Sequence, residues 1–164
     1  CKVSVATPAT RPRGGQFGRH ARALHGNPFD GHTLKAAIAD VEAISGVAVK
    51  RIHVDRGYRG HDYADRFKVW ITGQVRRVTA AIRKEMRRRA AIEPVIGHLK
   101  AGHRMDRNYL KGFEGDRANA VLAAAGYNFR LLLRWLALLL RALIQLILPS
   151  SPPPARPLPA AQNA

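Results

Sequence analysis

The chain has 164 residues, of which 28 are Lys or Arg and 11 are Asp or Glu, giving a formal net charge of +17. Its hydrophobic content of 46% excludes a wholly disordered chain, and its length suits one domain with a buried core. The excess of positive charge indicates a polyanionic partner, either nucleic acid or an acidic membrane surface. A single cysteine, Cys1, excludes an internal disulfide and favours a reducing compartment.

The N-terminal end of the chain predicts a β-hairpin. Residues 2–7 alternate apolar and polar side chains with the period of a half-buried strand. The sequence TRPRGG at residues 10–15 is typical of a turn, and residues 16–24 are a weaker strand candidate. We therefore expect the two strands to pair across that turn.

A helix is predicted after the hairpin. Apolar residues recur three and four positions apart between residues 34 and 44, which gives one apolar helix face. Gly46 fits the end of this helix. Asp30 or Thr33, in the loop before it, is free to cap the first turn.

The middle of the chain alternates short strands with helices. Residues 51–55 and 69–72 are short apolar strand candidates, separated by a loop or short helix at residues 58–67. A helical pattern then runs from about residue 78 to residue 100. The polar segment 103–115 contains two glycines and separates this helix from the next.

The last helical pattern covers residues 117–148, and a break is expected near Gly126. Arg134 and Arg141 interrupt its apolar part, so it holds no uncharged run of about 18 residues that would cross a membrane. A helix that packs on the core with one basic face is one interpretation, and an interfacial membrane helix is another. The proline-rich residues 149–164 predict a disordered tail.

Asp55 is the first candidate for chemistry. It ends an apolar strand and precedes the glycine-containing sequence RGYRG, so its carboxylate would be exposed and still held by the sheet. That placement suits a metal ligand. An ordinary turn aspartate would occupy the same position, and the residues alone leave both interpretations open.

Glu93 is the only acid in the basic run RRRAAIEPVIGHLK, residues 87–100. Arg89 precedes it by four positions and Lys100 follows it by seven, so a helix would place all three on one face. One interpretation is a surface ion pair, worth at most about 0.5 kcal/mol. Pro94 predicts that the helix starts or kinks just before Glu93, which a merely solvated face would not require.

Five motifs occur together, in one order, and cover most of the chain from residue 2 to about residue 147. They are HGNPFDGHTL (25–34), VDRGYRGH (54–61), RRRAAIEPVIGHLK (87–100), HRMDRNYLKG (103–112) and EGDRANAVLAAAGYNFRLLLRWL (114–136). In this combination the chain resembles bacterial insertion-sequence transposases of the DDE type, in the group whose founding members are numbered four and five.

The resemblance implies a ribonuclease-H-like α/β fold, with a mixed sheet, flanking helices and a long C-terminal helix. It also implies three carboxylates, two Asp and one Glu, that hold two Mg²⁺ or Mn²⁺ ions. Asp55 matches the second Asp of the family and Glu93 matches its Glu. Arg89 and Lys100 match the spacing around that Glu, whereas Met86 stands where the family has Tyr.

By the same resemblance, the partner is DNA, both the transposon ends and the target. Basic side chains would contact its phosphates and fix its register. A homodimer is left open, no membrane partner is implied, and the expected location is the bacterial cytoplasm in association with the nucleoid. The residues expected to bind DNA are Arg56, Tyr58, Arg89, Lys100, Arg104, Arg107 and Lys111.

The family's first Asp lies on a strand that precedes the hairpin, and this chain begins with Cys at the second strand. We therefore expect a C-terminal fragment, with a partial catalytic domain at residues 1–148 that is inactive in DNA cleavage and strand transfer. Asp55 and Glu93 should still lie close together in space, and Asp30 is the first acid that could complete the triad. Composition alone favours the alternative, a basic nucleic-acid-binding module without chemistry.

Overall fold

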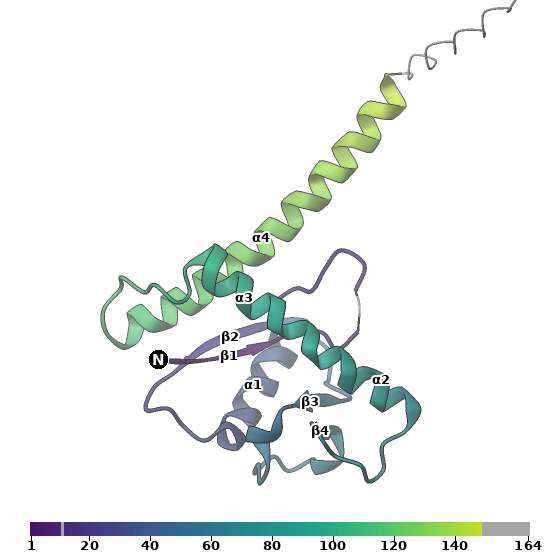
Figure 1. Ribbon diagram of the computed structural model, residues 1–164. Helices are drawn as coiled ribbons and strands as arrows, with labels where there is room; N and C mark the ends of the chain where they lie inside the picture. The colour runs from purple at the N-terminus through teal and green to yellow at the C-terminus, as the bar shows by residue number, and fades with distance from the viewer. Residues whose placement is uncertain (11, 149–164) are drawn as a thin grey trace, which may run out of the picture.

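Figure 1 shows a computed structural model of the chain, which describes residues 1–10 and 12–148. The protein is mixed α/β, with its elements in the order strand, strand, helix, strand, strand and three helices, joined by short 3₁₀ turns. This order agrees with the predicted order through the fourth strand, after which two helices were predicted and three are present. Residues 149–164, for which a disordered tail is predicted, lie outside the described residues.

β1 (Lys2–Ala6) and β2 (His20–Leu24) form the predicted hairpin, and they pair antiparallel. The second strand is shorter than the predicted residues 16–24. In the segment before it, Gly18 bonds to a helix: Gly18 N–H donates to Asn128 Oδ1, and Asn128 Nδ2 donates to Gly18 O, both at 2.9 Å. This side-chain clamp holds the hairpin against the C-terminal helix.

α1 (Asp30–Ser45) is the predicted first helix, and it ends as expected at Gly46, whose φ of 66° is left-handed and whose N–H bonds to Glu42 O. The predicted capping is wrong. The helix begins at Asp30 itself, and its N-cap, Phe29, makes no side-chain cap bond. Thr33 lies inside the first turn, where its Oγ1 donates to Asp30 O at 2.7 Å.

β3 (Ile52–Val54) and β4 (Val69–Ile71) are the two predicted short strands, and they pair parallel. The turns η1 (Arg56–Tyr58) and η2 (Arg66–Lys68) lie between them. The strands do not join β1 and β2 in one mixed sheet, as the resemblance implied. Within residues 1–10 and 12–148 they form two separate two-stranded sheets, and no strand of one sheet pairs with a strand of the other.

The predicted helix from residue 78 to residue 100 is divided. α2 (Ala80–Arg88) passes into a 3₁₀ turn, η3 (Arg89–Ala91), and α3 (Ile92–His103) begins next. The break directly before Glu93 confirms the prediction made from Pro94. As the third residue of α3, this proline lies in the first turn, where its missing N–H costs little.

α4 (Gly112–Ile147) is a single uninterrupted helix, so the predicted break near Gly126 is wrong. α3 and β2 both pack against α4. A methyl group added at Gly126 would lie 2.9 Å from His103 Nδ1 at the end of α3. This glycine therefore allows two helices to approach closely and does not end the one that contains it.

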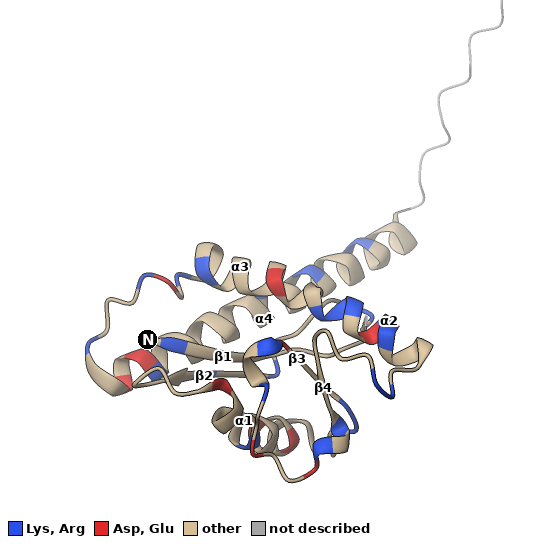
Figure 2. Ribbon diagram, turned by 60° about the horizontal axis from the view of Figure 1, so that its bottom comes forward, with Lys and Arg blue, Asp and Glu red and all other residues tan. Residues whose placement is uncertain are grey.

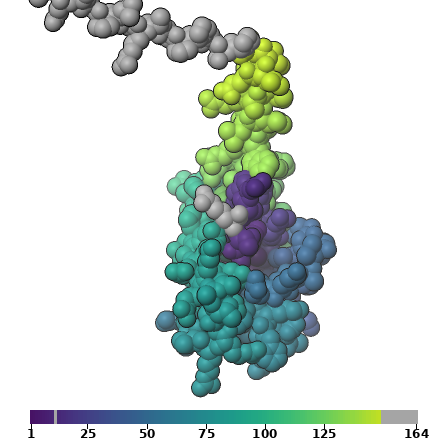
Figure 3. Space-filling view, turned by 90° about the vertical axis from the view of Figure 1, so that its right-hand side faces the viewer, coloured from purple at the N-terminus to yellow at the C-terminus, as the bar shows by residue number. Residues whose placement is uncertain are grey.

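The C-terminal half of α4 projects beyond the rest of the described chain (Figures 1 and 3). Arg134 and Arg141 lie on this part of the helix. Among residues 1–10 and 12–148, no helix combines the length and the apolar character needed to span a bilayer. Large apolar side chains exposed on this half include Leu132, Leu133, Trp135, Leu136, Leu138, Leu139, Leu140, Leu143, Ile144, Leu146 and Ile147.

The buried side chains form two separate clusters. The helical cluster joins α3 to α4, and its most buried member is Leu99, which is 1% exposed. The sheet cluster joins α1 to β3 and β4. The helical cluster contains Val95, Leu99, Ala123, Tyr127 and Leu131, and the sheet cluster contains Leu34, Ile38, Val54 and Val69.

Candidate active site

Asp55 directly follows the buried Val54 at the end of β3 and caps the turn η1. Its Oδ1 accepts a hydrogen bond from Gly57 N–H at 3.1 Å, while the residue as a whole is exposed. The strand and this bond fix the carboxylate, and the described residues offer no cation within ion-pair distance of it. The sequence correctly predicted an acid that is exposed and still anchored by the sheet.

A second carboxylate lies beside Asp55. A methyl group added at Gly57 would lie 2.5 Å from Asp30 Oδ2 and 3.2 Å from Asp55 Oδ1, so both acids flank this glycine. Lys2 Nζ lies 2.5 Å from Asp30 Oδ1 and neutralises it. Sequence reasoning named Asp30 only as a reserve candidate and missed Lys2 and Gly57. These residues come together because β1 and η1 both pack against α1.

Tyr58 is half-buried between these two acids and the sheet cluster. Burial raises the pKa of its hydroxyl above the ordinary value, and the negative charges of Asp30 and Asp55 act in the same direction. A hydrogen bond with Thr33 and the charge of Lys2 oppose that shift in pKa. The hydroxyl therefore stays protonated at neutral pH and is a hydrogen-bond donor next to the two carboxylates.

Glu93 lies in the first turn of α3 and is exposed. In the part of the chain that the structure describes, it forms no ion pair, either with Arg89 or with Lys100. The surface ion pair considered from the sequence is therefore absent. Val95 and Leu99, which are 2% and 1% exposed, anchor the other face of α3 and so fix the direction in which Glu93 points.

Glu85 connects the part of the chain that contains Asp55 to the part that contains Glu93. It lies on α2, and its Oε2 is 2.9 Å from His53 Nε2 on β3. Its Oε1 also accepts a hydrogen bond from Arg51 at 2.7 Å. The side chains of His53 and Glu85 are 4% and 18% exposed, so this contact lies largely inside the protein. Sequence reasoning did not single out this contact.

The residues predicted to bind DNA occupy two areas. Arg56 and Tyr58 lie in η1 beside Asp55, and Arg89 and Lys100 flank Glu93 along η3 and α3. A second group lies at the far end of α3, about 16 Å along the helix from Glu93. It consists of Arg104, which ends α3, and of Arg107 and Lys111 in the following loop. Figure 2 shows Lys and Arg recurring along α2, α3 and that loop.

A group of potential metal ligands that the sequence analysis did not identify lies elsewhere. Ligand atoms of Cys1, His25 and Asp116 lie within 4.8 Å of one another. Within residues 1–10 and 12–148, no group of three such side chains with this spacing includes Asp55 or Glu93. Those two acids therefore form no preorganised three-ligand cage.

Asp55 at a strand end and Glu93 at a helix start thus belong to a basic α/β domain, whose charge suits a polyanionic partner. The family described as Transposase DDE domain matches residues 41–133, which is more than half of the chain, so the chain belongs to this family. The matched segment includes β3, β4, α2 and α3, and with them Asp55 and Glu93. No curated protein and no solved structure matches the chain.

Proposed function

We propose that this chain belongs to the catalytic part of a transposase that cleaves DNA and transfers its strands, with Asp55 and Glu93 as ligands for Mg²⁺ or Mn²⁺. The observation that carries the proposal is the state of these two carboxylates. Both are exposed, and neither is paired with a cation among the described residues, in a chain with a net charge of +17. Unpaired acids on a basic surface can receive a metal ion together with a phosphate.

The donor set suits a hard divalent cation. Mg²⁺ is commonly held by one or two carboxylates together with waters and substrate phosphates, so it does not require a preformed cage of protein ligands. Asp55 uses Oδ1 for its bond to Gly57 N–H, which leaves Oδ2 for a ligand. When bound, such ions activate the attacking oxygen and stabilise the leaving oxygen of a phosphodiester.

The chain's own residues would bind and orient the DNA. Arg56 precedes Gly57 in the turn that positions Asp55, and Arg89 and Lys100 lie before and after Glu93. Their cationic groups would hold phosphates near the two acids by contacts that do not depend on base sequence. In a bacterial cell, such a surface favours association with the nucleoid.

Manganese binding tests the site assignment. Electron paramagnetic resonance titration of residues 1–164 should show that Asp55→Asn and Glu93→Gln each weaken Mn²⁺ binding at least about fivefold. Asp62→Asn and Asp106→Asn are matched controls, because both acids are exposed and unpaired in the described chain, and they should change nothing. Equal effects of all four substitutions would refute a specific site.

The net charge favours a second candidate, a DNA-binding module without chemistry. Fluorescence anisotropy with duplex DNA separates the two. In the proposed site, Mn²⁺ strengthens DNA binding by the intact chain, and Asp55→Asn and Glu93→Gln abolish that increase. In a module without chemistry, both substitutions strengthen DNA binding slightly, with or without the metal, because each removes a negative charge.

A further inference from the structure

Three potential metal ligands meet where the open end of the hairpin approaches the start of α4. Cys1 precedes β1, His25 follows β2, and Asp116 lies near the beginning of α4. Their ligand atoms lie within 4.8 Å of one another. Figures 1 and 2 show the beginning of β1 beside the first turns of α4. We call these three residues the Cys–His–Asp cluster.

His25 makes no hydrogen bond through either ring nitrogen among the described residues. Its Nε2 is buried without a partner, and its Nδ1 lies 3.8 Å from Asp116 Oδ2, which is too long for a hydrogen bond. The ring is nevertheless held in place, because it stacks on Phe113 with the two ring centroids 3.2 Å apart. Buried polar atoms normally have partners, so an imidazole that is fixed and unpaired indicates a bound ligand.

Asp116 is oriented in the way that metal-binding carboxylates commonly are. Asn108 Nδ2 donates to Asp116 Oδ1 at 2.7 Å, which fixes the carboxylate and leaves Oδ2 toward His25. Metal-ligating carboxylates usually accept a hydrogen bond of this kind from an outer residue. Within residues 1–10 and 12–148, no Lys or Arg forms an ion pair with Asp116. The ammonium of Lys2, next to Cys1, pairs with Asp30 instead.

The ligand types suit a transition metal with tetrahedral geometry. Cys1 is exposed and forms no disulfide, so its thiol is free to lose its proton to a metal. Zinc–ligand bonds of about 2.0–2.3 Å place neighbouring ligand atoms roughly 3.3–3.6 Å apart. The 3.8 Å between His25 Nδ1 and Asp116 Oδ2 is close to this spacing, so a small closing movement would complete the site. Thiolate and imidazole ligands favour Zn²⁺ over Mg²⁺ or Mn²⁺.

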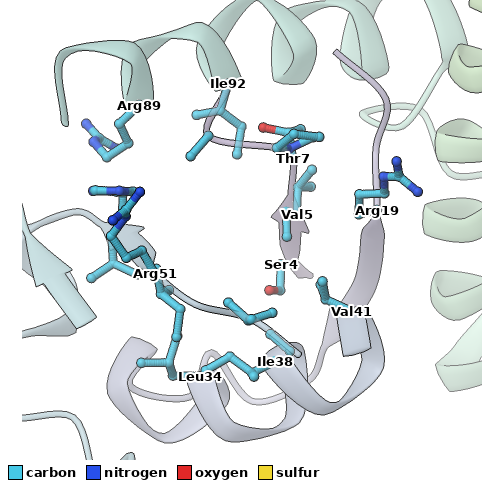
Figure 4. A pocket seen from close by; sticks show the side chains of 18 of the residues that line it. Ser4, Val5, Thr7, Arg19, Leu34, Ile38, Val41, Arg51, Arg89 and Ile92 are labelled. Atoms are coloured by element: carbon cyan, nitrogen blue, oxygen red, sulfur yellow. The ribbon is translucent and has the colours of Figure 1, made fainter. Parts of the chain in front are cut away.

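The cluster also has room for the ion and for a fourth ligand. Cys1, His25 and Asp116 line one pocket of about 590 Å³, so water can reach a metal bound there. The cavity of about 280 Å³ between β1 and β3 differs in charge. Four arginines and no Asp, Glu or Cys line it, and Figure 4 shows Arg51 and Arg89 among them. That lining repels a cation, whereas the cluster supplies a carboxylate and a thiol.

We propose that the Cys–His–Asp cluster is a Zn²⁺ site, in which Cys1 Sγ, a ring nitrogen of His25 and Asp116 Oδ2 bind the ion and the fourth position faces the pocket. The ion ties the open end of the hairpin to α4. The bonds between Gly18 and Asn128 hold the turn side of the hairpin against the same helix. Because metal binding contributes to folding free energy, Zn²⁺ stabilises the chain.

Cobalt substitution tests the ligands, because Co²⁺ bound to a thiolate gives a charge-transfer absorption band in the near ultraviolet. Residues 1–164 in a phosphine reductant should give a saturable band that Zn²⁺ removes and excess Mg²⁺ does not. His25→Phe keeps the stacking on Phe113, and Asp116→Asn keeps an acceptor for Asn108. Each should weaken Co²⁺ binding more than about tenfold, since even the loss of an outer-shell partner commonly costs that much.

Matched controls separate the cluster from general effects of charge and ring loss. Glu114→Gln removes an exposed acid two positions before Asp116 on the same helix, and His32→Phe replaces an exposed imidazole on α1. Neither should change Co²⁺ binding. An unchanged band in a folded ligand variant, or equal weakening by the controls, would overturn the proposal. X-ray absorption of the Zn²⁺-loaded intact chain needs no variant, and a metal shell without sulfur would also overturn it.

The amino group of Cys1 requires its own control, because a thiol and a neighbouring amine chelate metals without His25 or Asp116. A glycine–serine extension ahead of Cys1 turns that amine into an amide and should leave Co²⁺ binding unchanged. Loss of binding on extension would overturn the three-residue site. Zn²⁺ should raise the unfolding temperature of the extended chain, and equal stabilisation of Cys1→Ser would contradict the proposal. Asp55→Asn should not alter the band, so this site and the Mn²⁺ site stand or fail separately.

Discussion

Replacement of Glu85 by alanine should uncouple the two halves of the candidate site. Glu85 is the residue of α2 that bonds to both His53 and Arg51, and His53 lies two positions before Asp55. The buried contact to His53 is the larger contribution, since a hydrogen bond to a charged group is worth about 1.5–3 kcal/mol. The Arg51 side chain is 51% exposed, so its contact adds only about 0.5 kcal/mol.

We therefore expect Glu85→Ala to lower the free energy of unfolding by about 2–3 kcal/mol, measured by urea denaturation followed by circular dichroism. The substitution also leaves His53 without a hydrogen-bond partner at either ring nitrogen among the described residues. Mn²⁺ binding should weaken although Asp55 and Glu93 are intact. The control is Glu114→Ala, which removes an exposed pair with Arg117 and should cost less than about 0.5 kcal/mol. Equal losses for both variants would refute the reasoning.

The remaining predictions concern stability, DNA binding and activity. Burial lowers the pKa of His20, so the unfolded chain binds protons more readily than the folded chain. The unfolding temperature should therefore fall as the pH drops below about 6.5, and it should fall less steeply for His20→Gln. Leu99→Ala should cost about 2–5 kcal/mol in urea denaturation, and a loss below about 1 kcal/mol would contradict the assigned core. DNA affinity should fall steeply with salt in filter-binding titrations, and Arg89→Ala and Lys100→Ala should each reduce the slope by about one. Residues 1–164 alone should not cleave DNA in a gel assay with Mg²⁺ or Mn²⁺.

Local patterns predicted the elements of the fold well. The alternation of residues 2–7 gave β1, the apolar spacing of residues 34–44 together with Gly46 gave α1, and Pro94 gave the break before α3. These features depend on neighbours in sequence. The continuity of α4 through Gly126 depends on α3, which packs against this glycine. Helix propensity describes residues one at a time and cannot predict such a contact. Strand pairing is equally non-local, so the division into two sheets could not be predicted from periodicity.

In the candidate site, too, features set by sequence neighbours were predicted, and features set by tertiary packing were not. The exposure of Asp55 and the position of Glu93 at a helix start followed from residues beside them in sequence. The approach of Asp30 to Asp55 around Gly57 did not, because it needs α1 to pack against η1. The contact of Glu85 with His53 likewise joins residues 32 positions apart. The proximity of Asp55 and Glu93 stays a prediction, and a distance measured between spin labels in their place would test it.

The expected lack of cleavage follows from how the acids are arranged. Two-metal transfer needs carboxylates that hold both ions against one phosphate. In the described chain, no third ligand side chain completes a group within 4.8 Å that includes Asp55 or Glu93. Asp30 is the nearest substitute, but Lys2 neutralises it at 2.5 Å, and a cation there disfavours a second one. If residues 1–164 do cleave DNA with Mn²⁺, Asp30→Asn should abolish cleavage and Lys2→Ala should increase it. Cleavage that survives both Asp30→Asn and Glu93→Gln would show that neither acid holds a catalytic ion.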